Sequence, residues 1–180
     1  MFSWQYGVII ALVAGAVEQA IAVYGQYERI EQVSGFDYFN YDLRVRKYNR
    51  TTATLNGTIH IKQPMDDTYR FSTDVFHSSL GNNQYEHTPL HLPESGFCQF
   101  MDLLHREYPN AIKDIVHLTE PNKCPIPACE MHFLDLEFPN DVLPTSITRG
   151  VWKLILKGAH EGETMFHAVI VVRVFDNLFF

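Results

Sequence analysis

Hydrophobic and polar residues alternate along two neighbouring stretches of the chain, and this period of two predicts β-strands with one buried face. In residues 39–46 the hydrophobic positions are Phe39, Tyr41, Leu43 and Val45. In residues 51–62 the positions on the corresponding face are Ala53, Leu55, Gly57, Ile59 and Ile61. Asn49 falls between the two stretches, so we expect them to pair as a hairpin.

Four more strands are expected further along the chain, at residues 69–75, 130–138, 151–157 and 166–174. In the last of these, every even position from Phe166 to Val174 is apolar. Turn-forming residues such as Gly81-Asn82-Asn83 separate the strands, and the chain has no internal repeat or long linker. Many short strands at this spacing predict a sandwich or barrel rather than alternating β and α units.

One segment has the period of a helix instead. Its hydrophobic residues recur at intervals of three and four: Phe97, Phe100, Met101, Leu104 and Tyr108. We expect a helix over residues 95–107 that is capped by Ser95 and ends before Pro109. The pattern therefore predicts an all-β domain with one short amphipathic helix laid across it.

Composition narrows the class of protein. The chain has 180 residues, of which 46% are hydrophobic and 19% charged, as in a folded globular protein. This length fits a single domain. The 14 Lys and Arg residues against 21 Asp and Glu residues give a net charge of −7, with no basic cluster. Nucleic acid is therefore not expected as a partner.

The first 22 residues predict a secretory leader. Residues 8–17 are all apolar or small, but this run is shorter than the roughly 20 residues of a membrane-spanning helix, and Glu18 interrupts it. Two small-x-small patterns, at residues 14–16 and 20–22, offer cleavage sites, and the second leaves the fuller hydrophobic segment. We expect a signal peptide over residues 1–22 and one secreted, extracellular domain over 23–180. A buried N-terminal helix is the alternative.

Two glycosylation sequons agree with secretion. Asn49-Arg50-Thr51 and Asn56-Gly57-Thr58 both match the acceptor pattern, and the strand alternation places Asn56 on a solvent-facing side. Glycans at Asn49 and Asn56 are therefore expected in an oxidising compartment.

Four markers in a fixed order give the chain a family resemblance. They are the first sequon followed by Leu55-Asn56-Gly57, Cys98 in the helical segment, the run Cys124-Pro125-Ile126-Pro127, and Leu143-Pro144 followed by Gly150 and an aromatic-bearing strand. In this order they resemble the insect chemosensory protein A family, which is similar to the ganglioside-activator and ML lipid-recognition proteins. The resemblance covers residues 36–175.

This resemblance implies a fold and a function. The fold would be a two-sheet, immunoglobulin-like (ML-like) sandwich with an apolar cavity between the sheets. The function would be secreted binding of a lipid or hydrophobic semiochemical in gustatory or pheromone perception. The partners would be a small hydrophobic ligand and a membrane receptor on sensory neurons, with no cofactor.

Three cysteines leave room for one disulfide. A Cys98–Cys124 bridge would tie the helix to the following strand region and contribute roughly 3–4 kcal/mol by chain entropy. The competing Cys124–Cys129 pair would close a tight loop stiffened by two prolines, which disfavours the bridge geometry. We expect Cys98–Cys124 bridged and Cys129 free. No second Cys or His pair at matching spacing supports a zinc site, so no metal is expected.

Motifs of common enzymes are missing from the sequence. His87 and His91 are four residues apart, but Pro89 lies between them and disfavours a shared helix face. The chain has no zinc-protease helix motif, no nucleophile elbow and no glycine-rich phosphate loop. We therefore expect no enzymatic activity and assign no catalytic residue. A lipid hydrolase whose site assembles only in space remains an alternative.

The apolar stripes supply the candidate ligand-binding residues. On sequence alone each of these side chains fits an ordinary core, and the resemblance favours a cavity. The predicted cavity residues are Leu55, Ile59, Ile61, Phe71, Val75, Phe97, Phe100, Met101, Leu104, Trp152 and Leu154. A structural or adhesive extracellular sandwich with a filled interior is the third hypothesis.

Overall fold

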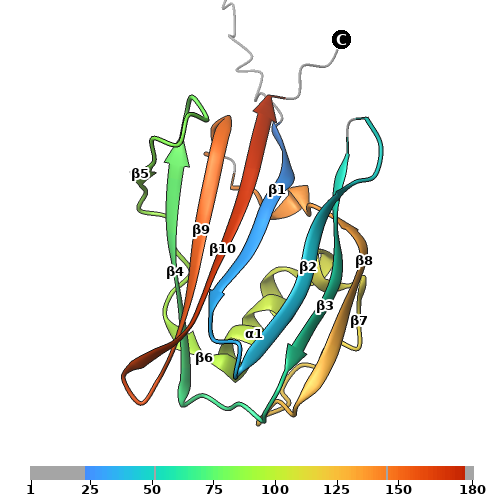
Figure 1. Ribbon diagram of the computed structural model, residues 1–180, viewed down its shortest axis with the longest axis vertical. Helices are drawn as coiled ribbons and strands as arrows, with labels where there is room; N and C mark the ends of the chain where they lie inside the picture. Colours follow the sequence, from blue (N-terminus) through green and yellow to red (C-terminus); the bar gives the residue numbers. More distant parts are fainter. Residues whose placement is uncertain (1–22, 51, 145, 177–180) are drawn as a thin grey trace, which may run out of the picture.

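The chain folds into two antiparallel β-sheets that form a sandwich with one helix inserted between them (Figure 1). The computed structural model describes residues 23–50, 52–144 and 146–176. The predicted leader, residues 1–22, lies outside this part of the chain. The predicted all-β, two-sheet sandwich with a short helix is confirmed.

The larger sheet has six strands in the order β1-β10-β9-β4-β5, and β6 pairs separately with β4. Its strands are β1 (Val23–Ser34), β4 (Tyr69–Ser78), β5 (Glu86–His87), β6 (Ser95–Gly96), β9 (Gly150–His160) and β10 (Glu163–Asp176). The expected strands at 69–75, 151–157 and 166–174 form its centre. Because β9 and β10 are joined by a hairpin and β4 pairs with β9, this part of the inner face is built from three long strands.

The smaller sheet has four strands in the order β2-β3-β8-β7. They are β2 (Phe39–Lys47), β3 (Ala53–Ile61), β7 (Ile115–Val116) and β8 (Cys129–Glu137). The predicted hairpin is present, because Phe39 pairs with Ile61 and Lys47 with Ala53. The remaining elements are α1 (Phe97–Glu107), α2 (Pro109–Ile112) and the single 3-10 turn η1 (Asn140–Val142). No helix in the described residues is long and apolar enough to cross a bilayer.

Strand β1 was not predicted, because its hydrophobic residues do not follow a period of two. It pairs with β10 along its length, but the register shifts between Tyr27 and Arg29 and again between Gln32 and Ser34. Each bulge moves the next inward-facing side chain by one position. The inward series therefore runs through Tyr27 and Ile30, an interval of three that hides the strand in the sequence.

The predicted N-cap of the helix was wrong. Ser95 does not cap α1, because its backbone pairs with Phe71 in the β6–β4 ladder. The cap position is Gly96, and the carboxylate of Asp67 accepts a hydrogen bond from the backbone N–H of Gln99 at 3.1 Å. A Cβ on Gly96 would overlap the Asp67 side chain, so glycine permits this approach. A residue from the β3–β4 connection thus satisfies a free N–H of the helix.

One side of the sandwich is joined by the side chain of Gln32. Its amide nitrogen donates to the carbonyl of Phe39 at 2.8 Å, and its amide oxygen accepts from the N–H of Tyr41 at 3.1 Å. Gln32 belongs to β1 of the larger sheet, whereas Phe39 and Tyr41 belong to β2 of the smaller one. The amide therefore takes the place of a strand neighbour and holds the two sheets together at this edge.

Candidate functional site

The predicted cavity residues divide between two hydrophobic clusters. The first cluster contains Leu55, Ile61, Phe71, Phe97 and Met101, with Ile59, Phe100 and Leu104 packed against it. The second contains Val75 and Trp152, with Leu154 packed against it. Tyr27 packs against both clusters. The interior of the described sandwich is thus two packed regions rather than one continuous core.

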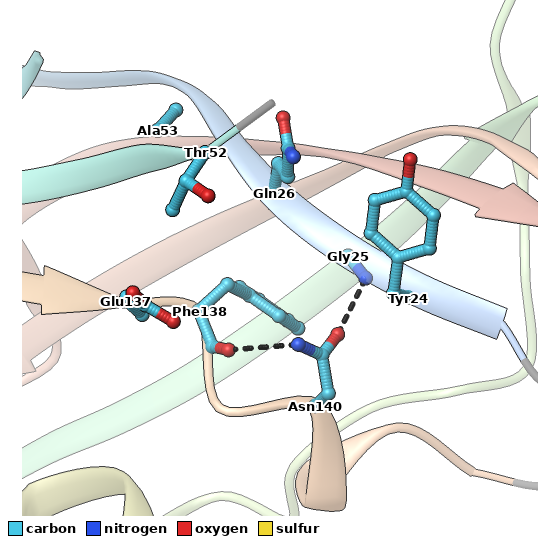
Figure 2. Close-up of a pocket in the computed structure, with 8 residues that line it drawn as sticks. All are labelled: Tyr24, Gly25, Gln26, Thr52, Ala53, Glu137, Phe138 and Asn140. Carbon is cyan, nitrogen blue, oxygen red and sulfur yellow. Dashed lines mark hydrogen bonds between the residues drawn. The ribbon is translucent and has the colours of Figure 1, made fainter. Parts of the chain in front are cut away.

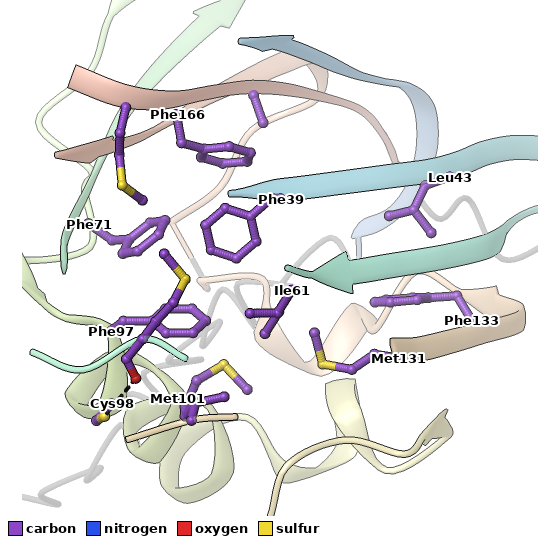
Figure 3. Packing of buried hydrophobic residues seen from close by; sticks show 14 of the residues in the cluster. Phe39, Leu43, Ile61, Phe71, Phe97, Cys98, Met101, Met131, Phe133 and Phe166 are labelled. Atoms are coloured by element: carbon purple, nitrogen blue, oxygen red, sulfur yellow. Dashed lines mark hydrogen bonds between the residues drawn. The ribbon is translucent and has the colours of Figure 1, made fainter. Parts of the chain in front are cut away.

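The first cluster is a well-packed core that joins both sheets and the helix (Figure 3). The Phe39 ring of β2 lies 5.6 Å from Phe97 of α1, 5.8 Å from Phe71 of β4 and 4.9 Å from Phe166 of β10, measured between ring centroids. Met65, another member of this cluster, is completely buried. The predicted helix residues therefore anchor α1 in a core at this end of the sandwich.

The second cluster lies on the inner face of the larger sheet at the start of β9. Trp152 is buried, its ring stacks on His77 at 4.2 Å, and its indole N–H donates to the carbonyl of Thr148. Four of the partly buried residues that pack against this cluster come from loops: Phe138, Leu143 and Ile147 from the β8–β9 connection and Leu90 from the β5–β6 connection. Loops, not the smaller sheet, therefore cover this part of the larger sheet.

A row of four paired side chains crosses the larger sheet where these two packed regions meet. Ile30 of β1 pairs with Ile170 of β10, Ile170 pairs with Leu154 of β9, and Leu154 pairs with Val75 of β4. We call these four residues the central row. Val75 is buried, but Ile30, Ile170 and Leu154 are only half-buried, although each packs against a core cluster.

The central row shares its partial exposure with other inward-facing residues, such as Leu156 of β9 and Ile59 of β3. Ile155 and Val169, which pair on the outer face of the same two strands, are half-buried as well. Two other residues of that outer face, Val151 and Val171, are buried, so partial exposure is found on both faces of these strands. Solvent reaches the inward-facing side chains of the central row, so the sandwich is incompletely closed over the middle of the larger sheet.

Two tyrosines flank the β1 end of the central row. Tyr27 precedes Ile30 on β1, and burial raises the pKa of its phenol to about 12. Tyr41 lies on β2 on the same face as buried Phe39 and Leu43, packed against the first cluster. Its hydroxyl is buried and has no hydrogen-bond partner in the described part of the chain. Burial, and secondly the charge of Glu31, raise the pKa of this phenol.

A pocket of about 250 Å³ opens at the edge of the sandwich, between the start of β1 and the end of β8 (Figure 2). Asn140 of η1 joins β1 to the segment that follows β8, because its side-chain oxygen accepts the Gly25 N–H at 2.6 Å and its nitrogen donates to the Phe138 carbonyl at 3.2 Å. A Cβ on Gly25 would lie 2.7 Å from the Phe138 ring. That ring contacts Tyr27 edge-on at 5.2 Å, so one aromatic side chain links the pocket to the central row.

Two further depressions lie away from the central row. One, of about 420 Å³, is lined by Asn40, His60, Ile61, Lys62, Ala128, Cys129 and Glu130. The other, of about 410 Å³, lies beside α2 and the end of β8; its lining is polar except for Leu134, Leu136, Phe138 and Pro139, and it shares Glu137 and Phe138 with the first pocket. Ile61 is the one predicted cavity residue that lines any of these three depressions. The predicted apolar cavity therefore stays a prediction, and the central row is the best candidate for its wall.

The predicted disulfide is confirmed. Cys98 of α1 and Cys124 are bonded with a Cα–Cα distance of 5.8 Å, and Cys129 is free and half-buried. Asp67 lies close to both sulfur atoms. Because these sulfurs are bonded to each other, they are not available as thiolate ligands, and the group does not form a metal site.

The two sequon asparagines have different surroundings. Asn49 is exposed in the β2–β3 turn, where its side-chain oxygen accepts the Thr52 N–H at 2.7 Å. Asn56 is half-buried on β3, and its amide nitrogen, the atom that a glycan would modify, donates to Asp135 at 3.2 Å. Asn49 is therefore the more accessible acceptor.

Comparison with protein-family models finds no family that matches this chain, and comparison with curated proteins finds no match.

Sequence reasoning missed several residues of this site: Tyr27, Ile30, Tyr41, Phe138 and Ile170. Tyr41 and Ile170 were already on the buried faces of predicted strands, so the alternation carried a signal for them. Tyr27 and Ile30 were hidden by the bulges of β1. Phe138 ends a predicted strand, and its role depends on a contact with Gly25 that lies more than a hundred residues earlier in the chain.

Proposed function

We propose that this protein is a secreted carrier that binds a small hydrophobic ligand over the central row, between the two sheets. The observation that carries this proposal is the half-buried state of Ile30, Ile170 and Leu154, three inward-facing aliphatic residues at the boundary of two packed clusters. A monomeric sandwich gains nothing from leaving such side chains open to solvent, whereas an apolar ligand would cover them.

The binding energy would come mainly from the hydrophobic effect. Covering apolar surface contributes about 25 cal/mol per Å², so about 100 Å² of newly buried side chain would supply about 2.5 kcal/mol before the ligand's own surface is counted. An alkyl chain has little polar surface to desolvate, which suits a site whose few polar groups are phenols. The proposed ligand class is therefore a lipid or a hydrophobic semiochemical.

The pocket beside Phe138 is the proposed entrance. The pocket lies at the sandwich edge. The Phe138 ring lines it and also contacts the Tyr27 ring. A rotation of the Phe138 ring would connect the pocket with the central row, while Gln32 keeps β1 attached to the smaller sheet and Asn140 keeps it attached to the segment that follows β8.

Extracellular action in chemosensory perception is part of the same proposal. The leader-like N-terminal sequence, the two sequons and the disulfide support an oxidising compartment. The resemblance to insect chemosensory protein A supports a role in gustatory or pheromone detection, with a receptor on sensory neurons as the proposed partner.

Secretion from insect cells followed by native mass spectrometry tests the carrier proposal. We expect the purified protein to carry an excess mass that organic extraction removes, and the extracted protein to bind the neutral fluorescent probe N-phenyl-1-naphthylamine. Leu154→Arg, which places a charge in the central row, should abolish both, whereas Ile155→Arg on the outer face of the same strand should abolish neither. A protein that carries no small molecule and does not bind the probe would contradict the proposal.

A further inference from the structure

The hydroxyl of Tyr41 is a buried polar atom that the fold itself does not explain. Most buried side-chain hydroxyls form at least one hydrogen bond, because leaving one unsatisfied costs about 1–3 kcal/mol. The Tyr41 hydroxyl is buried and has no partner in the described residues, whereas the backbone N–H of the same residue is paired with Gln32. Phenylalanine would give the same packing without this cost. The hydroxyl is therefore a candidate contact for a ligand.

The position of Tyr41 relates this hydroxyl to the central row. The Tyr41 N–H lies 3.1 Å from the side-chain oxygen of Gln32, and Gln32 is two residues from Ile30 on β1. Tyr41 also packs against the first hydrophobic cluster, as Ile30 does. Gln32 thus places Tyr41 on the β1 side of the sandwich, the side on which the central row begins.

The charges around Tyr41 select against an anionic ligand. Glu31 is the charged residue whose field acts on the phenol, and its negative charge helps to raise the Tyr41 pKa. Arg29 is 3.4 Å from Glu31 and is engaged in that exposed ion pair. A carboxylate at the Tyr41 hydroxyl would be desolvated without a cation of its own, which is strongly unfavourable. An uncharged oxygen would need only a donor, which the phenol supplies.

We propose that the Tyr41 hydroxyl donates a hydrogen bond to the oxygen of an uncharged, long-chain ligand such as an alcohol, aldehyde or ester, and that the site rejects the corresponding carboxylate. This inference rests on the proposed function. It names the chemical class of ligand that the site selects, and it assigns the specificity to one residue.

The test is displacement of N-phenyl-1-naphthylamine by four ligands of equal chain length near neutral pH: dodecane, dodecanol, dodecanal and dodecanoate. We expect dodecanol and dodecanal to bind about five- to tenfold more tightly than dodecane, the gain of one hydrogen bond, and dodecanoate to bind most weakly. Tyr41→Phe should remove the advantage of the two oxygenated ligands and leave dodecane unchanged. Tyr48→Phe, which alters an exposed ring in the β2–β3 turn, is the matched control.

The outcomes separate this inference from the proposed function. Dodecanoate binding as tightly as dodecanol, or an unchanged ligand ranking in Tyr41→Phe, would overturn the inference while leaving a hydrophobic carrier intact. Failure of the probe and of all four ligands to bind would overturn the carrier proposal and this inference with it. Tyr41→Phe removes only an unsatisfied hydroxyl, so its thermal midpoint should not fall. If that variant does not fold, the ranking of the four ligands by the unmodified protein still decides.

Discussion

Replacing Leu154 with alanine tests whether the central row is a ligand-facing wall or ordinary core. Leu→Ala removes three carbon groups, and fully burying such groups contributes about 0.8 kcal/mol each, or about 2.4 kcal/mol in total. In a packed core the unfilled cavity adds to this loss, giving about 2–5 kcal/mol. Leu154 keeps part of its surface in solvent, so somewhat less than the full transfer energy and little cavity cost are expected. The predicted loss for Leu154→Ala is therefore about 1.5–2 kcal/mol, smaller than the loss in a packed core.

Leu55→Ala is the matched control for this prediction. Leu55 is 4% exposed and belongs to the first cluster, so the same chemical change should cost about 2–5 kcal/mol there. Urea unfolding of the ligand-free protein, followed by far-ultraviolet circular dichroism, gives both free energies. In the same samples, Leu154→Ala should weaken N-phenyl-1-naphthylamine binding. Equal losses of stability at the two positions would show that Leu154 is packed core and would refute the reasoning.

Three other predictions concern the covalent framework and the surface. Cys98→Ser should lower the free energy of unfolding by about 3.5 kcal/mol, the chain-entropy value for a sequence separation of 26, and an unchanged urea midpoint would contradict this. Asn49→Gln should reduce the glycan mass seen on gels more than Asn56→Gln does, because Asn56 is engaged by a neighbouring carboxylate; the reverse order would argue against this. The hydrogen bond that Asp74 accepts from Lys157 is the main cause of the lowered pKa of Asp74. The ionised Asp74 therefore stabilises the fold at pH values above the ordinary pKa of an aspartate, and this stabilisation is lost as the pH falls through the lowered pKa. Lys157→Met should raise that pKa in an NMR titration, and an unmoved titration curve would exclude this cause.

The strands with strict alternation could be predicted from the sequence, and β1 could not. In the β2–β3 hairpin every inward residue lies two positions from the next, so the pattern and the pairing agree. In β1 two bulges change the spacing, and the strand is recognised only through its partner β10. The helix shows the same limit, because the group that accepts the free Gln99 N–H is Asp67, about thirty residues earlier. Local patterns predict elements, whereas caps and register depend on distant contacts.

The candidate site could be predicted only in part for a related reason. Periodicity identified Leu154 and Trp152 as inward-facing, but it could not distinguish the half-buried residue from the buried one. That difference depends on what lies opposite each side chain. Trp152 is in the region covered by the β8–β9 connection, whereas Leu154 is beside it in the central row. Likewise, the missing partner of the Tyr41 hydroxyl is a property of the folded interior.

The most direct test of the central claim is methyl NMR of the protein with labelled isoleucine and leucine, titrated with N-phenyl-1-naphthylamine. Ile170 and Leu154 lie on the inner face of β10 and β9, and Ile155 lies on the outer face of β9, so one sheet supplies both the site and its control. We expect nuclear Overhauser contacts from the aromatic protons of the probe to the methyl groups of Ile170 and Leu154, and none to Ile155. Contacts confined to Ile155, or to methyl groups elsewhere on the surface, would contradict binding between the sheets.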